Sequence, residues 1–151
     1  MRIAIGSDHA GYDMKEQLKG FLAKRSIEVL DCGPDTGDKP PEYVAIAKHV
    51  AQQAAAGQVD GGILICGTGI GMSIAANKVP GARAGLCNEL FSVKYAKSDV
   101  NINVLCMGSR IISQRMAEEI TTLWLDIPFS GGRFIPRLQK ISELEVEMRG
   151  C

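Results

Sequence analysis

Short apolar segments alternate along the chain with longer segments whose apolar residues recur at helical spacing. Segments that are short and apolar throughout are typical of strands that lie buried between two layers of helices in a parallel sheet. Alternation of such strands with helices is typical of βαβ units and not of a β-sandwich. The pattern therefore predicts five strands, at residues 2–6, 28–31, 62–66, 82–87 and 103–107.

The longer segments predict helices between and after these strands. Residues 11–25 place Met14, Leu18 and Leu22 on one face of a helix. These elements predict a Rossmann-like α/β fold of three layers, α/β/α, with a five-stranded parallel sheet, and residues 1–151 are expected to form a single domain. Further helices are expected at residues 43–56, 73–78, 113–125 and 133–148, the last with an apolar stripe of Leu138, Ile141, Leu144 and Met148.

The composition narrows the classes of partner. With 151 residues, 46% of them apolar and 23% charged, the chain can bury a core and does not belong to a disordered class. Its 17 Lys and Arg residues equal its 17 Asp and Glu residues, so no overall field attracts nucleic acid or an anionic membrane. We therefore expect a small-molecule partner, without nucleic acid and without a membrane.

The five cysteines form no Cys-x-x-Cys pair and have only two histidines to complete a metal site, so no metal is expected. Their odd number is typical of reduced intracellular thiols. Residues 1–6 lack the apolar segment of a signal peptide, and no apolar run approaches the roughly 18 residues that cross a membrane. A cytoplasmic protein is expected.

Polar and reactive residues follow the predicted strands. In open parallel sheets, ligands bind beyond the carboxyl ends of the strands, so these residues are expected at one edge of the sheet. The proline-rich loop at residues 33–41 also begins there and is a candidate lip over a site. The residues that follow the strands are Asp8 and His9, then Cys66 to Gly71, Asn88 and Glu89, and finally Ser109 and Arg110.

The run Cys66-Gly67-Thr68-Gly69-Ile70-Gly71 is the strongest candidate, because it places a thiol before a turn of backbone N–H donors. Its spacing matches neither the Walker motif nor the dinucleotide motif. The alternative is a turn that needs glycine for its backbone geometry alone, with Cys66 as a small buried apolar residue. Its place before a helix, where thiols are more reactive, favours a functional Cys66. The other four cysteines are expected to be structural.

Arg133 and Arg137 lie four residues apart at the start of the last predicted helix, so both guanidinium groups share one face and suit a phosphate. Solvated surface arginines are the alternative. Asp8 has a structural alternative as the cap of the first helix. His49 has no titratable partner at helical spacing and is expected on the surface.

Three motifs carry a resemblance to a known family. They are Gly6-Ser7-Asp8-His9-Ala10-Gly11, the run from Asp60 to Lys78, and Gly131-Gly132-Arg133 with Arg137. Together they resemble ribose-5-phosphate isomerase type B and its relatives, the galactose-6-phosphate isomerase subunits, over nearly the whole chain. The resemblance implies aldose–ketose isomerisation of a sugar phosphate without metal or cofactor, in homodimers or homotetramers whose active sites lie at a subunit interface.

The resemblance also implies roles for individual residues. Cys66 would move a proton between C1 and C2 of the sugar, and the backbone amides of residues 67–71 would bind the enediolate. Some of the arginines would act across the dimer. The implied catalytic residues are Cys66, Thr68 and Asp99, and the implied substrate-binding residues are Asp8, His9, Tyr43, Gly67, Gly69, Ile70, Gly71, Arg110, Arg133 and Arg137.

Two positions depart from the family pattern. Where the pentose-phosphate enzymes carry a His-Asn pair that opens the furanose ring, this chain has Asp99 and Val100, and Phe134 stands where the family usually has histidine. Asp99 would replace the ring-opening acid if it were held in its protonated form. We expect ribose 5-phosphate as the substrate, with galactose 6-phosphate, allose 6-phosphate and a tetrose 4-phosphate as alternatives. A tetrose 4-phosphate cannot form a furanose ring and needs no ring-opening acid.

Two other classes of function remain open. A phosphosugar-binding module without catalysis would keep the glycine loop and the arginines, but it has no need of Cys66. A flavodoxin-like nucleotide-binding module follows from the architecture alone.

Overall fold

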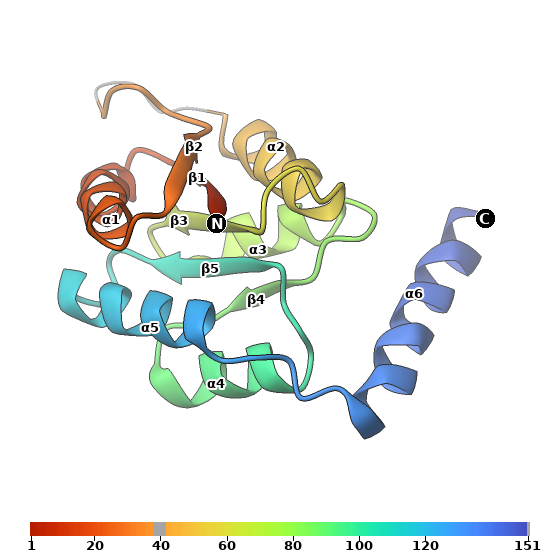
Figure 1. The fold of residues 1–151 in the computed structure, drawn as a ribbon. Helices are drawn as coiled ribbons and strands as arrows, with labels where there is room; N and C mark the ends of the chain where they lie inside the picture. The colour runs from red at the N-terminus through yellow and green to blue at the C-terminus, as the bar shows by residue number, and fades with distance from the viewer. Residues whose placement is uncertain (38–41, 151) are drawn as a thin grey trace.

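A parallel sheet of five strands forms the centre of the computed structural model, which describes residues 1–37 and 42–150. Neighbouring strands are parallel throughout, so the predicted α/β fold is confirmed (Figure 1). In the order β2-β1-β3-β5-β4, the strands are Glu28–Asp31, Arg2–Ser7, Gly61–Cys66, Val104–Gly108 and Ala84–Leu86.

Helices cover both faces of the sheet. Ile63 and Ile65 of β3 pack in one core cluster with α1, α4 and α5, whereas Leu64 and Cys66 pack in a second cluster with α2 and α3. The alternation along β3 therefore directs the Cys66 side chain to the face covered by α2 and α3. The helices are α1 Tyr12–Lys24, α2 Tyr43–Ala55, α3 Ile70–Ala76, α4 Leu90–Ser98 and α5 Gln114–Asp126. No helix among the described residues is long and apolar enough to span a membrane.

Three elements depart most from the predictions, and the other predicted elements differ by at most two residues at their ends. Helix α4 has no predicted counterpart, because Val93 is its one buried residue among the described positions and its apolar pattern is weak. Helix α3 begins at Ile70 and not at residue 73, so Gly71 belongs to its first turn. Strand β4 covers only Ala84–Leu86.

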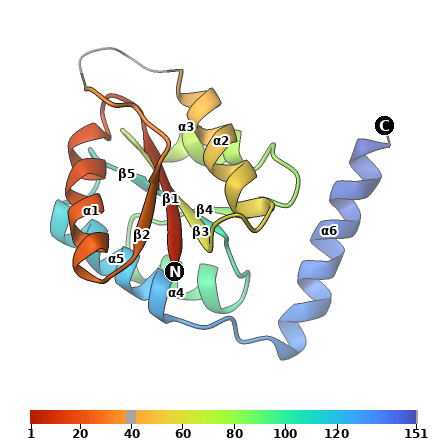
Figure 2. The ribbon, with the colours of Figure 1, turned by 45° about the horizontal axis from the view of Figure 1, so that its top comes forward.

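The last helix, α6 (Ile135–Arg149), stands outside the three layers (Figure 2), and the Glu145 carboxylate joins it to the loop before β4 by accepting a hydrogen bond from the amide of Gly81 at 2.9 Å. A 3-10 turn at Gly132–Phe134 precedes it. The apolar stripe predicted for this helix is exposed in the described chain, where Leu144 is 56% and Met148 61% accessible. The helix was correctly predicted, but its apolar residues stay largely exposed beside an open groove that they share with residues 77–83.

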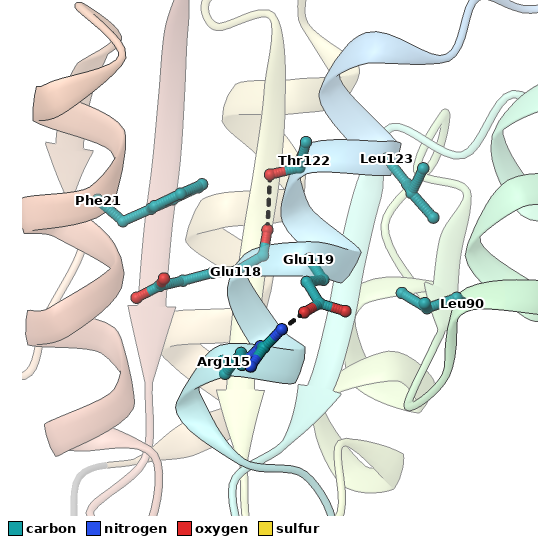
Figure 3. Close-up of a pocket in the computed structure, with 7 residues that line it drawn as sticks. All are labelled: Phe21, Leu90, Arg115, Glu118, Glu119, Thr122 and Leu123. Carbon is teal, nitrogen blue, oxygen red and sulfur yellow. Dashed lines mark hydrogen bonds and ion pairs between the residues drawn. The ribbon is translucent and has the colours of Figure 1, made fainter.

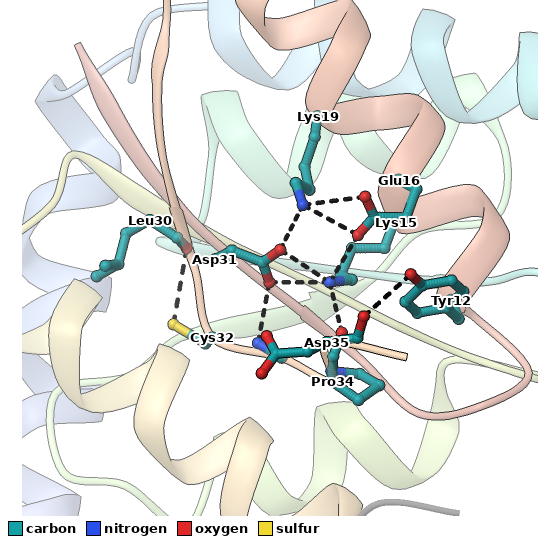
Figure 4. A network of polar contacts seen from close by, with 10 residues as sticks. Tyr12, Lys15, Glu16, Lys19, Leu30, Asp31, Cys32, Pro34 and Asp35 are labelled. Atoms are coloured by element: carbon teal, nitrogen blue, oxygen red, sulfur yellow. Dashed lines mark hydrogen bonds and ion pairs between the residues drawn. The ribbon is translucent and has the colours of Figure 1, made fainter. Parts of the chain in front are cut away.

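A buried lysine anchors the loop after β2 (Figure 4). Lys15 is fully buried, and its Nζ donates hydrogen bonds to Asp31 Oδ1 and to the carbonyl of Pro34, both at 2.9 Å. Lys19 Nζ lies 2.5 Å from the other carboxylate oxygen of Asp31. The carbonyl of Gly33 accepts from the amide of Ser7 at the end of β1. Gly33 and Pro34 of the predicted lip are thus tied to the edge of the sheet, and residues 38–41 lie outside the described part of the chain.

Asp31→Asn tests this anchor. Burial acts to raise the pKa of Asp31, but hydrogen bonds from Lys19, Lys15 and the amide of Gly33 outweigh it, and the pKa lies below its ordinary value of 3.8. The stability contributed by the carboxylate is therefore present at neutral pH and is lost as the pH falls below that value. We expect the variant to lose about 2 to 3 kcal/mol of unfolding free energy at pH 7, because the buried Lys15 loses one of its two counter-charges and keeps only Glu16, at 2.9 Å.

Urea unfolding at several pH values measures this effect. The difference between the unaltered protein and Asp31→Asn should stay constant above roughly pH 5 and shrink as the pH falls from roughly 4 to 2. A difference that stays constant over this range would contradict the assignment.

Candidate active site

The candidate site lies at the point where the order of the strands in the sheet reverses. Strand β2 lies on one side of β1, and β3, β5 and β4 follow on the other. Loops that leave neighbouring strands at such a point diverge and open a crevice in which α/β proteins bind ligands. The amide of Asp8 donates to the carbonyl of Ile65 at 3.0 Å, so the loop that carries Asp8 and His9 runs directly beside the end of β3.

Cys66, the last residue of β3, faces the glycine turn. Its side chain is buried, with 7% of the residue accessible, and the amide of Gly69 donates to Sγ at 3.1 Å. Gly69 has a φ of +82°, a left-handed conformation that a side chain would strain. Within the described residues, the amides of Gly67, Thr68 and Gly71 have no acceptor. The thiol is therefore an acceptor beside a set of preorganised N–H donors.

The other thiols lie in different surroundings. Burial raises the pKa of Cys87 to about 11, and burial together with the nearby Asp31 carboxylate raises that of Cys32 to about 11. Burial likewise raises the pKa of Cys106. These thiols stay protonated, which agrees with the structural role predicted for them, and Cys151 lies outside the described residues. No three His, Cys, Asp or Glu side chains of the described residues are grouped as a metal site.

Asn88 and Ser109 fix the loops around Cys66. Asn88 Nδ2 donates to the carbonyl of Thr68 at 3.2 Å, and its Oδ1 accepts from the amide of Gly108 at 2.8 Å. Ser109 Oγ donates to the carbonyl of Ala10 at 2.7 Å. Both residues closely follow predicted strands in the sequence. An amide and a hydroxyl side chain do not by themselves indicate a catalytic or binding role, so the sequence assigns them none.

Tyr43 and Arg110 flank the glycine turn. A Cβ built at Gly71 would lie 3.2 Å from Cε2 of Tyr43, so the ring lies against the turn. A Cβ built at Gly67 would lie 3.4 Å from Nη1 of Arg110, so the guanidinium group covers the other side. A phenol and a cation therefore border the same turn.

Asp8, His9 and Thr68 also lie at this edge. Asp8 Oδ1 accepts from the amide of Gly11 at 2.9 Å, so this carboxylate stabilises the start of α1 and keeps its second oxygen for a ligand. His9 is exposed. Thr68 Oγ1 accepts from the amide of Ile70 at 3.3 Å, which leaves the hydroxyl proton for another acceptor.

Asp99 does not lie beside Cys66 within the chain. It follows the last residue of α4, and its amide donates to the carbonyl of Tyr95. The chain then enters β5, whose first residue, Val104, pairs with Gly62 near the start of β3. Cys66 is at the far end of β3, about 13 Å further along the strand. Asp99 therefore lies at the opposite edge of the sheet.

Arg133 and Arg137 leave the body at that same opposite edge. The amide of Ser130 donates to the carbonyl of Ser98 at 2.9 Å, which holds the segment before the arginines against the end of α4. Helix α6 then runs outside the layers, past the loop that contains Gly81 (Figure 2). The single chain thus brings together the predicted residues of the Cys66 edge, but not Asp99, Arg133 and Arg137.

A separate groove lies on the outer face of α5, between α1 and α4 (Figure 3). Its volume is about 490 Å³. Two of its side chains are carboxylates, and its one cation, Arg115, pairs with Glu119 at 3.0 Å. This groove is a poor match for a phosphate. It is lined by Phe21, Leu90, Arg115, Glu118, Glu119, Thr122 and Leu123.

The fold and the Cys66 turn together define an α/β protein with a site suited to proton transfer next to a developing negative charge. The model of the Ribose/Galactose Isomerase family matches residues 3–141. The chain belongs to this family, whose class is that of sugar phosphate isomerases.

Individual relatives agree with the assignment. Ribose-5-phosphate isomerase B of Escherichia coli is 41% identical and aligns over 95% of this chain and 96% of its own length. D-erythrulose-4-phosphate isomerase of Pectobacterium atrosepticum is 39% identical, over 96% of this chain and 95% of its own. The crystal structure of ribose-5-phosphate isomerase B from Mycoplasma genitalium with bound ribulose-5-phosphate has a TM-score of 0.91 and 37% identity, over 97% of each chain.

Gly69→Ala tests the geometry of the turn. Besides the positive φ, the new Cβ would lie 2.9 Å from the backbone carbonyl carbon of Met107. Gly57→Ala is the matched control, because Gly57 has a φ of +67° but nothing within 4 Å of a new Cβ. We expect Gly57→Ala to cost about 1 kcal/mol of unfolding free energy and Gly69→Ala about 2 to 4 kcal/mol.

Thermal or urea unfolding of both variants measures the difference, and isomerase activity should fall only in Gly69→Ala. Equal stabilities with full activity in both would show that the turn tolerates a side chain and that its close packing has been misassigned.

Proposed function

We propose that this chain interconverts an aldose phosphate and its ketose, with ribose 5-phosphate as the aldose. The observation that carries the proposal is the Cys66 thiol, which accepts a hydrogen bond from Gly69 next to three amides without an acceptor among the described residues. Family membership supports the class of reaction. The name of the Escherichia coli relative and the ribulose-5-phosphate bound in the Mycoplasma genitalium structure support the pentose phosphate.

In the proposed mechanism, the Cys66 thiolate removes the proton from C2 of the open-chain aldose. The electron pair forms a C1–C2 double bond, and the carbonyl oxygen on C1 becomes negative. The amides of Gly67, Thr68 and Gly71 stabilise this enediolate, and one such donor typically contributes about 3 to 4 kcal/mol to the transition state. The proton of the C2 hydroxyl passes to the C1 oxygen within the enediolate. Cys66 then returns the carbon-bound proton to C1, and the C2 oxygen becomes the ketone. The reaction is redox-neutral within one molecule, so no cofactor is proposed.

The neighbouring side chains position the sugar and its phosphate. The Thr68 hydroxyl and the Tyr43 ring border the turn on the substrate side. The free oxygen of Asp8 and the imidazole of His9 suit sugar hydroxyls or the phosphate, and the Arg110 guanidinium supplies a cation for the phosphate.

A second copy of the chain completes the proposed site. Asp99, Arg133 and Arg137 lie at the edge opposite Cys66, so they serve a site only if another subunit brings its Cys66 edge to them. The exposed apolar stripe of α6 supports this arrangement, because a helix that leaves such residues uncovered suits an interface. A homodimer is the smallest assembly that meets this requirement, and a homotetramer would contain it.

A tetrose 4-phosphate is the second candidate substrate, and it is favoured by Asp99 and Val100 in place of the ring-opening pair. In ribose 5-phosphate, the C4 hydroxyl closes the furanose ring, and an acid must open it before isomerisation. In a tetrose 4-phosphate, that oxygen carries the phosphate, and no such ring forms. The 39% identity to the relative named D-erythrulose-4-phosphate isomerase also supports this candidate.

Cys66→Ala tests the base. We expect kcat to fall by roughly a thousandfold, because the proton loses its acceptor, while binding of ribitol 5-phosphate is retained. Ribitol 5-phosphate has no carbonyl and cannot react. Cys32→Ala is the control, since that thiol lies at the end of β2, and it should leave kcat within twofold. Binding without turnover in the unaltered protein would instead indicate a non-catalytic module.

Asp99→Asn separates the two substrates. We expect turnover of ribose 5-phosphate to fall by about a hundredfold or more, because an amide cannot donate the ring-opening proton, and turnover of erythrose 4-phosphate to stay within threefold. Galactose 6-phosphate and allose 6-phosphate complete the panel, and the unaltered protein shows which substrate it prefers. Equal losses on ribose 5-phosphate and erythrose 4-phosphate would mean that Asp99 has no specific part in ring opening.

A further inference from the structure

The ring of Phe134 lies close to two cations. Arg133 Cζ is 5.0 Å from the centre of the ring, and Arg137 Cζ is 5.5 Å from it. Both distances are within the roughly 6 Å over which a guanidinium group is attracted to an aromatic face. The ring is partly buried, whereas both arginines are exposed. One apolar side chain thus contacts both guanidinium groups.

The two arginines have no other partner that would orient them. In the described part of the chain, neither makes an ion pair or a hydrogen bond to a protein acceptor. Like charges four residues apart on a helix repel each other, and long side chains are free to turn away from each other in water. Contact with the ring opposes both effects and leaves every N–H group of the pair available.

The backbone fixes the position of the ring. Gly131 and Gly132 have φ values of +64° and +52°, and the amide of Phe134 donates to the carbonyl of Gly131 at 3.1 Å. Pro136 lies in the first turn of α6, where its fixed φ favours the helix. The ring therefore stands at a defined point at the start of the helix, with one arginine before it and one after it.

We propose that Phe134 is a positioning residue that holds Arg133 and Arg137 together as one phosphate-binding pair. The inference rests on the proposed function, in which the two arginines bind the phosphate of the sugar in the site of the second copy. Two guanidinium groups held in place lose less side-chain freedom when the phosphate binds, so the ring raises affinity without touching the substrate. It acts on binding and not on proton transfer at Cys66.

Phe134→Leu removes the aromatic face and keeps an apolar side chain, and Phe134→Tyr keeps the face. We expect Phe134→Leu to raise KM for the preferred sugar phosphate, and Kd for ribitol 5-phosphate, about tenfold, with kcat within twofold. Phe134→Tyr should restore both constants. Phe21→Leu is the matched control, because Phe21 has Arg25 Cζ at 6.0 Å from its ring but lies on α1, away from the arginine pair.

Titration calorimetry and steady-state kinetics give these values, and ribitol without phosphate serves as the reference ligand. An unchanged KM and Kd in Phe134→Leu, a loss confined to kcat, or a Phe134→Tyr variant as weak as Phe134→Leu would each overturn the inference alone. If the unaltered protein neither turns over any sugar phosphate of the panel nor binds ribitol 5-phosphate, the proposed function fails, and the inference fails with it.

Discussion

The backbones at the carboxyl ends of β1, β3 and β5 lie so close together that two positions have no room for a side chain. A Cβ at Gly11 would lie 2.5 Å from the carbonyl oxygen of Ile65, and a Cβ at Gly108 would lie 2.6 Å from the backbone of Thr68. Three loops therefore meet with only backbone between them. The Cys66 thiol and the free amides of the glycine turn occupy this meeting point, and their geometry depends on it.

The same sheet separates the chemistry of the chain into two edges. The thiol, the amides and Arg110 lie at the carboxyl ends of the strands, whereas Asp99 and the arginine pair lie at the amino ends, about 13 Å or more away. Helix α6 lies outside the layers and leaves its apolar stripe largely exposed. The proposed dimer reconciles these features, because it places one edge of each chain against the other edge of its partner.

The sequence was sufficient for the sheet and for the residues that the fold gathers at the Cys66 edge. The strands are buried on both faces, so their uniform apolar character identifies them, and the rule that ligands bind at the carboxyl ends of strands brings Asp8, Cys66 and Arg110 together correctly. Helix α4 escaped prediction because Phe91 and Tyr95 are exposed and blur its apolar face. Spacing along one chain also cannot show that Asp99 and the arginines face away from Cys66, because only the fold defines the two edges.

A hybrid dimer tests the shared site most directly. Chains carrying Cys66→Ala and chains carrying both Arg133→Ala and Arg137→Ala are coexpressed with two different tags, and the hybrid is isolated through both tags. If the site is shared, one site of each hybrid contains both defects and the other contains none, so kcat/KM per dimer should recover to about half that of the unaltered protein, far above either parent variant. If each chain forms its whole site alone, the hybrid stays as inactive as its parents, and that result would contradict the account.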